Sequence, residues 1–277
     1  MSGRRTGIVG IVVPVISDIN HAKIVSELEM QLFKLGYNSL ISYTTLNEDK
    51  RNQYLHLLSS KSVDGIIVVG SFTSDLDAAA DFAAVQPRAP IVVVGGLVNQ
   101  VGVPSVYADD YGAIRSLATE LLEKGYHSLV YLNDSVTFTG TQKLRGFNDA
   151  LASSAPQGQG ATLFVKQGDD IINAACEAIS SLIESGASLS GILAADDSLA
   201  IGALKALRKR NMQMPVIGYN NTRYARGATP ELSSIDNDYP LMCKTAVEIL
   251  RKLLNGETVS ENVIIPTHLA ERETYKR

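Results

Sequence analysis

The sequence predicts an α/β protein built around parallel sheets, and three observations support this fold class. Short apolar runs of strand length recur along the 277 residues, and most lack polar alternation, which is typical of strands buried on both faces. Longer amphipathic patterns of helical period separate these runs. Glycine follows four of the helical patterns, where a left-handed C-cap is favourable: Gly36, Gly125, Gly186 and Gly256.

The predicted elements alternate from one end of the chain to the other. In order, the strands are Val9–Val13, Ser39–Tyr43, Gly65–Val69, Ile91–Val94, Leu129–Leu132, Thr162–Val165, Gly191–Ala194 and Val216–Tyr219. The helices are Ala22–Leu35, Glu48–Ser60, Ile114–Lys124, Gln142–Ser153, Ile171–Ser185, Leu199–Arg210 and Leu241–Leu254. About eight parallel strands can close into one barrel or form two doubly wound halves, and these patterns leave both arrangements open.

The first strand resembles a signal peptide only superficially. Arg4 and Arg5 precede the apolar run Gly7–Ile16, but Pro14 interrupts that run and no small-residue cleavage site follows before Asp18. No run approaches the ~18 to 20 apolar residues of a membrane span. We therefore expect a strand here, and no association with a membrane.

The most informative segment is 191–204, in which an apolar strand runs into two carboxylates and then a helix rich in alanine and leucine. Ligands of open parallel sheets bind at the carboxyl ends of strands, where the next helix begins. Asp196 or Asp197 is expected to cap that helix, and the other carboxylate could face a ligand. Similar junctions recur along the chain, so the sequence predicts a cleft that binds a small polar molecule.

The composition of the chain argues against nucleic-acid binding by these residues. The net charge is −4 and the pI is about 5.6, so there is no basic surplus to neutralise a nucleic-acid backbone. Cys176 and Cys243 lie far apart within helical patterns, which suits buried, reduced thiols in a cytoplasmic protein.

Motifs for catalysis, metal binding and cofactor binding are absent. The sequence contains no phosphate-binding loop, no dinucleotide-binding glycine motif, no zinc motif and no nucleophile elbow. Adjacent carboxylates such as Asp109 and Asp110 are usually helix caps rather than acid–base pairs. We therefore expect no enzyme activity, no metal and no cofactor.

A set of short sequence motifs, which occur along the chain in the order given below, resembles the effector-binding core of the lac repressor/gal repressor family of bacterial transcription regulators. The similarity extends from about Val9 to Thr274. The motifs are Val9–Pro14 with Ile16–Asp18, Val63–Val69, Leu121–Gly125 with Ser128–Tyr131, Leu144–Phe147 with Ala150–Leu151, Asp197–Ala203, Val216–Tyr219, Pro230–Ile235 and Arg272–Thr274.

The resemblance implies a fold like that of the periplasmic binding proteins, with two doubly wound parallel-sheet lobes joined by three crossovers. The N-terminal lobe would comprise residues 6–125 and 238–266, and the C-terminal lobe residues 126–237 and 267–277. In this family the lobes close on an effector, and the motion repositions an N-terminal DNA-binding headpiece. That headpiece is expected to be absent from this chain, so operator DNA would be bound only through it.

The resemblance also implies site residues, with departures from the family. The family's ligand-binding Asp at the 191–204 junction corresponds to Asp197, with helix capping as the alternative role. Lys143 stands where the family has an Arg, and Asn220 where many members have an Asp. Since one change keeps a positive charge and the other removes a negative one, the pocket is expected to be more positive than in relatives and to suit an anion.

Four further positions are polar. Asn20 and His21 replace aromatic residues that often face the ligand, although Asn20 could instead cap the following helix. Ser71 follows the third strand, where stabilising a turn is an equally good explanation, and Asn237 stands where relatives often have a Gln. A polar pocket with little aromatic stacking favours a sugar, sugar phosphate or polyol over a nucleobase.

We therefore predict the small-molecule-sensing core of a homodimeric, cytoplasmic transcriptional repressor. The alternative is a secreted solute-binding protein that delivers a sugar-like ligand to a transporter. The segment upstream of Arg4 would distinguish them, since a helix-turn-helix pattern indicates the first and a secretory signal the second.

Overall fold

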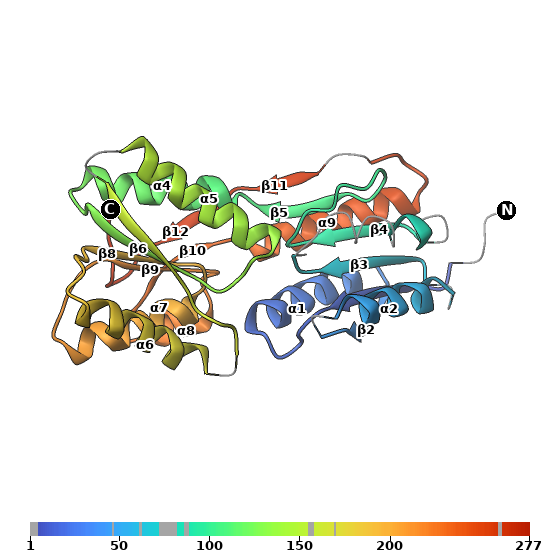
Figure 1. Cartoon of the computed structure of the whole chain (residues 1–277). Coiled ribbons are helices and arrows are strands. Elements are labelled where there is room, and N and C mark those ends of the chain that lie inside the picture. The colour runs from blue at the N-terminus through green and yellow to red at the C-terminus, as the bar shows by residue number, and fades with distance from the viewer. Residues whose placement is uncertain are drawn as a thin grey trace. The chain divides into compact units, whose positions relative to one another are not determined.

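The chain folds into two α/β units, each with an open six-stranded sheet (Figure 1). The computed structural model describes residues 5–45, 47–60, 63–71, 82–85, 89–154, 158–168, 170–259 and 262–277. Unit 1 consists of Met1–Ala108 and Asp238–Pro266, and unit 2 of Asp109–Asn237 and Thr267–Arg277. The chain therefore passes between the units three times. Two doubly wound sheets are confirmed, and the single barrel is excluded.

Unit 1 has the strand order β11-β5-β4-β3-β1-β2, and every neighbouring pair is parallel. Its strands are β1 Ile8–Val13, β2 Asn38–Tyr43, β3 Gly65–Val69, β4 Ile91–Val94, β5 Ser105–Ala108 and β11 Val263–Ile265. Its helices include α1 Ile19–Lys34, α2 Glu48–Ser60 and α9 Tyr239–Leu254.

The core of unit 1 shows why its central strands are apolar throughout. Alternate residues of β1, β3 and β4 point to opposite faces of the sheet. On one face Val9 and Ile67 join a cluster with α1 and α9, while on the other Val12 and Ile66 pack against α2. A strand covered by helices on both faces needs apolar side chains at every position.

Unit 2 has the strand order β12-β10-β9-β8-β6-β7, in which the pair β10 and β12 is antiparallel and the others are parallel. Its strands are β6 Ser128–Asn133, β7 Gln159–Phe164, β8 Gly191–Ala194, β9 Val216–Tyr219, β10 Ser233–Asp236 and β12 His268–Ala270. Its helices are α4 Asp110–Glu123, α5 Phe138–Ser153, α6 Ile171–Glu184, α7 Asp197–Lys209 and α8 Arg223–Gly227.

Helix α4 belongs to unit 2, whereas the sequence analysis assigned it to the first lobe by placing the boundary at residue 125. Its close packing against α5 explains the difference. A Cβ atom added to Gly146 of α5 would lie 2.5 Å from the Tyr111 carbonyl oxygen of α4, so only glycine allows this approach. Gly202 plays the same part between α7 and α6, where a Cβ would lie 2.4 Å from the Ile172 carbonyl oxygen.

Most of the predicted helices begin earlier in the structure, because their first turns precede the apolar periodic pattern. Helix α1 begins at Ile19 rather than Ala22, and its N-cap is Asp18, whose carboxylate accepts from the backbone N–H groups of Asn20 and His21. Asn20 therefore lies within the first turn and does not cap the helix.

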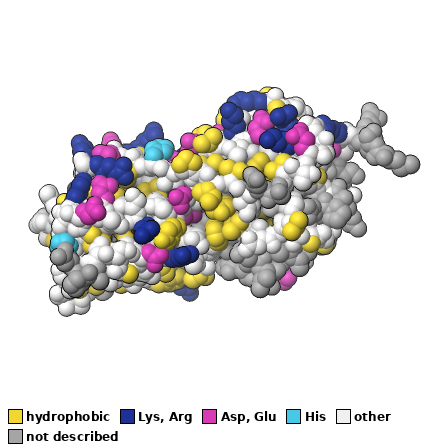
Figure 2. Space-filling view, turned by 90° about the horizontal axis from the view of Figure 1, so that it is seen from above, with side chains coloured by type: hydrophobic (Ala, Val, Ile, Leu, Met, Phe, Trp, Pro, Cys, Tyr) yellow, Lys and Arg dark blue, Asp and Glu magenta, His cyan; other side chains and the backbone are white. Residues whose placement is uncertain are grey.

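The surface carries charges of both signs close together. On the face shown in Figure 2, Lys and Arg side chains lie among Asp and Glu side chains. This mixture agrees with the small net charge of −4. No helix among the described residues is both long and apolar enough to span a bilayer.

Candidate functional site

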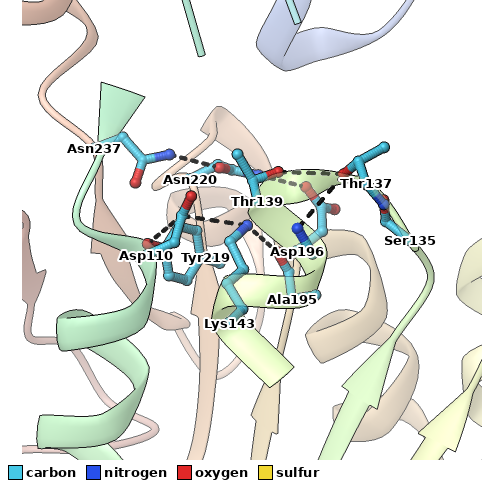
Figure 3. Close-up of polar contacts among 11 residues, drawn as sticks. Asp110, Ser135, Thr137, Thr139, Lys143, Ala195, Asp196, Tyr219, Asn220 and Asn237 are labelled. Atoms are coloured by element: carbon cyan, nitrogen blue, oxygen red, sulfur yellow. Dashed lines mark hydrogen bonds and ion pairs between the residues drawn. The ribbon is translucent and has the colours of Figure 1, made fainter. Parts of the chain in front are cut away.

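A group of polar side chains, which we call the strand-end cluster, lies at the carboxyl ends of strands in unit 2 and on the helices α4 and α5 (Figure 3). Parallel strands end at the same edge of a sheet, so residues that are remote in sequence meet there. The cluster consists of Asp110, Asp134, Ser135, Thr137, Thr139, Lys143, Asp196, Tyr219, Asn220 and Asn237.

A chain of hydrogen bonds connects the ends of β10, β9 and β8. Asn237 donates from Nδ2 to Oδ1 of Asn220 at 2.9 Å, and Asn220 donates from its own Nδ2 to Oδ2 of Asp196 at 2.9 Å. Asp196 also caps α7 by accepting from the backbone N–H of Ser198 at 2.7 Å. Asn220 has φ +86°, a left-handed conformation that Asn tolerates better than most residues. These contacts hold the three side chains in fixed positions.

Lys143 extends from α5, and its ammonium group is buried among Asp110, Ala195 and Tyr219 (Figure 3). Its Nζ donates to the carbonyl oxygen of Ala195 at 3.2 Å and lies 3.8 Å from Oδ1 of Asp110. The same Nζ lies 3.8 Å from the centroid of the Tyr219 ring, a cation–π contact. Tyr219 in turn donates its hydroxyl to Oδ1 of Asp110 at 2.7 Å.

Two carboxylates of the cluster, Asp110 and Asp134, have a raised pKa and so hold protons more strongly than free Asp side chains. Burial raises the pKa of Asp110, and the opposing influences of Lys143 and Tyr219 are smaller. Burial also raises the pKa of Asp134, and the negative charge of Asp196 raises it further. The positive charge of Lys143 opposes the rise in pKa at both Asp110 and Asp134. That charge is therefore already balanced by carboxylates within the unit. The expectation of a more positive pocket did not include these two carboxylates.

Three hydroxyl groups lie at the N-terminus of α5. The Ser135 Oγ and Thr137 Oγ1 atoms are 2.8 Å apart, and Thr137 Oγ1 is 3.4 Å from Thr139 Oγ1. Thr137 is the N-cap of the helix, and Asn133 at the end of β6 fixes the turn by donating from Nδ2 to the Ser135 carbonyl oxygen at 3.0 Å. Hydroxyls both donate and accept, so this row can match the hydroxyls of a ligand.

Asp197, the neighbour of Asp196 in the sequence, is completely buried. Its Oδ2 accepts from the backbone N–H of Thr222 at 2.6 Å and from the Thr222 hydroxyl at 2.8 Å, and its Oδ1 accepts from Ser234 at 2.6 Å. The carboxylate therefore ties α7 to the segments that follow β9 and form β10. Of the two neighbouring carboxylates, the cap Asp196 is the one that joins the cluster.

The buried position of Asp197 predicts a pH dependence of stability. Burial raises its pKa from 3.8 to about 6. Between these values the folded protein keeps a proton that the unfolded chain has lost, so the free energy of unfolding should fall as the pH rises from about 4 to about 6. Urea denaturation across this range should show the fall, and the Asp197→Asn variant, which cannot titrate there, should show a flatter profile. Identical slopes in the two proteins would contradict the prediction.

The remaining predicted site residues lie in unit 1, after β1 and β3. His21 places Nδ1 3.1 Å from the carbonyl oxygen of Val15, and burial lowers its pKa against the influence of Asp18. Its Nε2 would lie 3.7 Å from a Cβ atom added to Gly70, so the ring lies beside the backbone that leads into Ser71. Within unit 1 the structure thus places His21 near Ser71, with Asn20 in the same first turn of α1.

The structure brings together Lys143, Asn220 and Asn237 and adds residues that the sequence analysis did not single out as binding residues. Asp134, Ser135 and Thr137 directly follow a strand that was predicted, so the strand-end rule could have found them. Asp110 follows β5, whose short sequence Ser-Val-Tyr-Ala gave no clear strand signal. Among the described residues, no group of three or more His, Cys, Asp or Glu side chains could hold a metal ion.

Comparison with known proteins agrees with the fold. The model of the family described as periplasmic binding proteins and the sugar-binding domain of the LacI family matches residues 6–273. An HTH-type transcriptional regulator of Lachnoclostridium phytofermentans is 31% identical over 275 residues, which are 96% of this chain and 81% of that protein.

Two solved structures share the fold at lower identity. A periplasmic binding protein/LacI transcriptional regulator from Alkaliphilus metalliredigens, complexed with D-xylulofuranose, has a TM-score of 0.80 and 22% identity, covering 98% of this chain and 100% of that one. The lac repressor dimer bound to operator and an anti-inducer has a TM-score of 0.88 and 20% identity, covering 100% and 96%. With the family match over nearly its whole length, the chain belongs to the LacI family, as the effector-binding core of a transcriptional regulator and not an enzyme.

Proposed function

We propose that the effector is a sugar or a sugar derivative and that the strand-end cluster of unit 2 binds it. The observation that carries this proposal is the hydrogen-bonded chain Asn237, Asn220 and Asp196 beside the hydroxyls of Thr137 and its neighbours. Amides, hydroxyls and a carboxylate held in fixed positions suit a ligand whose surface alternates hydroxyl donors and acceptors. Asn20, His21 and Ser71 are proposed as the polar groups of unit 1 that bind the effector, while Asp197 holds the start of α7 in place through its bonds with Thr222 and Ser234.

The family relationship supports the regulatory part of the proposal. The xylulofuranose complex shares the fold, and the lac repressor structure is a dimer on its operator. We propose that this protein acts in the cytoplasm as a homodimeric repressor, whose operator binding belongs to a headpiece outside these residues. Effector binding to the core would then regulate operator binding.

Thermal unfolding with a panel of ligands tests the proposed effector class. The panel contains sugars, sugar phosphates and polyols, with nucleobases and amino acids for comparison. A ligand at about a hundred times its Kd stabilises the folded state by about 2.7 kcal/mol, which for a protein of this size raises the Tm by several degrees. We expect such a shift with at least one sugar-like compound. A shift with nucleobases or amino acids alone would contradict the proposal.

Substitutions then test the cluster itself. Asn237→Ala removes one end of the hydrogen-bonded chain, and loss of one such group should weaken effector binding by about tenfold to a hundredfold. Asn173→Ala is the matched control, because Asn173 lies on α6, where its side chain forms hydrogen bonds with Asp170 and Lys205. Titration calorimetry should show weaker binding in the first variant and unchanged binding in the second. Equal affinities in the two variants would place the effector elsewhere.

A further inference from the structure

The charge balance of the strand-end cluster narrows the class of effector. An anionic group on a ligand, such as a phosphate, needs a cation or several N–H donors that are free to approach it. Lys143 is the cation of the cluster, so the question is whether its ammonium group is available. The sequence alone suggested that it is.

Protein groups already surround the ammonium group of Lys143. The Ala195 carbonyl oxygen accepts a hydrogen bond from it at 3.2 Å, Asp110 lies at 3.8 Å, and the face of the Tyr219 ring lies at 3.8 Å from Nζ. The side chain is only 10% exposed. A phosphate that used Lys143 would have to break these contacts and would lie beside the carboxylate of Asp110.

Carboxylates outnumber cations in the rest of the cluster. Burial raises the pKa of Asp134, and the negative charge of the neighbouring Asp196 raises it further. Asp196 accepts from Asn220 and from the Ser198 backbone, both of them neutral donors. A phosphate at this edge of the sheet would therefore add a third negative group close to two others.

Apart from Lys143, the polar groups of the cluster are neutral or negative. The hydroxyls of Ser135, Thr137 and Thr139 and the amides of Asn220 and Asn237 can pair with hydroxyls, and carboxylate oxygens accept hydroxyl protons. We propose that the effector is an uncharged, polyhydroxylated sugar, and that unit 2 selects against its phosphorylated or carboxylated counterparts. This inference rests on the proposed function and makes its ligand class specific.

Matched pairs of ligands test the inference. D-xylulose with xylulose 5-phosphate, and D-glucose with glucose 6-phosphate, are titrated into the protein at low ionic strength, where charge effects are least screened. We expect at least one uncharged sugar to bind, and its phosphorylated partner to bind at least about tenfold more weakly, which corresponds to about 1.4 kcal/mol. Binding of a phosphorylated sugar as tightly as its partner, or more tightly, would overturn the inference and leave the proposed function standing. Binding of neither member of any pair, nor of any other sugar in the panel, would overturn the proposed function and the inference with it.

Removal of the two negative charges tests the cause of the selectivity. In the double variant Asp134→Asn and Asp196→Asn, the side-chain shapes are retained, and Asn still serves as an N-cap at position 196. The ratio of affinities between the sugar and its phosphate should shrink by about tenfold in this variant. Asp149→Asn makes the same chemical change near the C-terminal end of α5, where Asp149 contacts Tyr111 and Arg145. This control variant should leave the ratio of affinities unchanged. An unchanged ratio in the double variant would overturn the proposed cause. A general weakening of sugar binding by the two substitutions would affect both ligands alike and would cancel in the ratio.

Discussion

Replacing Asp197 by alanine is expected to lower the free energy of unfolding by about 3–5 kcal/mol. The substitution leaves three buried donors without an acceptor, namely the Thr222 backbone N–H, the Thr222 hydroxyl and the Ser234 hydroxyl. Each unsatisfied buried donor costs about 1–3 kcal/mol, and the effects of neighbouring groups are not additive. Since the sequence contains no tryptophan, urea denaturation would be followed by circular dichroism.

The adjacent carboxylate provides the control. Asp196→Ala removes an N-cap and the bond from Asn220, but Asp196 is less deeply buried, so a loss of about 1–2 kcal/mol is expected. The two variants differ by one position in sequence and involve the same change of residue. If Asp197→Ala lowered the free energy of unfolding no more than Asp196→Ala, the buried hydrogen bonds of Asp197 would contribute no more to stability than the N-cap does.

Replacing Lys143 by methionine is also expected to lower the free energy of unfolding by about 3–5 kcal/mol. Methionine keeps the approximate length of the side chain but removes the ammonium group, which leaves the buried carboxylate of Asp110 without its cation. The carbonyl oxygen of Ala195 loses its donor at the same time. Urea denaturation measures this loss, and the raised pKa of Asp110 should rise further in the variant.

A second substitution distinguishes this cause from a simple loss of packing. In the double variant Lys143→Met with Asp110→Asn, the uncompensated charge is gone, so more than half of the lost stability should return. Lys124→Met is a control of the same chemistry at the surface, where Lys124 pairs with Glu120 at 3.3 Å, and it should have a much smaller effect. No recovery in the double variant would show that the charge of Asp110 is not the cause.

The central strands of both sheets could be predicted from the sequence because their environment is the same on both faces. Strands β3, β4, β8 and β9 match the predicted bounds, and each is a continuous run of buried residues. The strands β5 and β10 were not predicted, because each begins with serine and neither contains a continuous run of aliphatic residues. In β10, Ser233 is buried and donates to the carbonyl oxygen of Tyr275, so the C-terminal segment of the chain satisfies a polar group that no local pattern explains.

The sequence by itself determined the alternation of strands and helices, the position of polar residues after several strands, and the family. Each of these depends on local composition and on short motifs. Tertiary structure alone decided that α4 belongs to unit 2, that Asp196 rather than Asp197 joins the strand-end cluster, and that Asp110 compensates Lys143. Asp110 at the start of α4, Lys143 on α5 and Tyr219 at the end of β9 are far apart in sequence, and they interact only because the fold brings these three elements together. The electrostatic character of a site depends on distances of a few ångströms between such residues, and a one-dimensional pattern does not contain those distances.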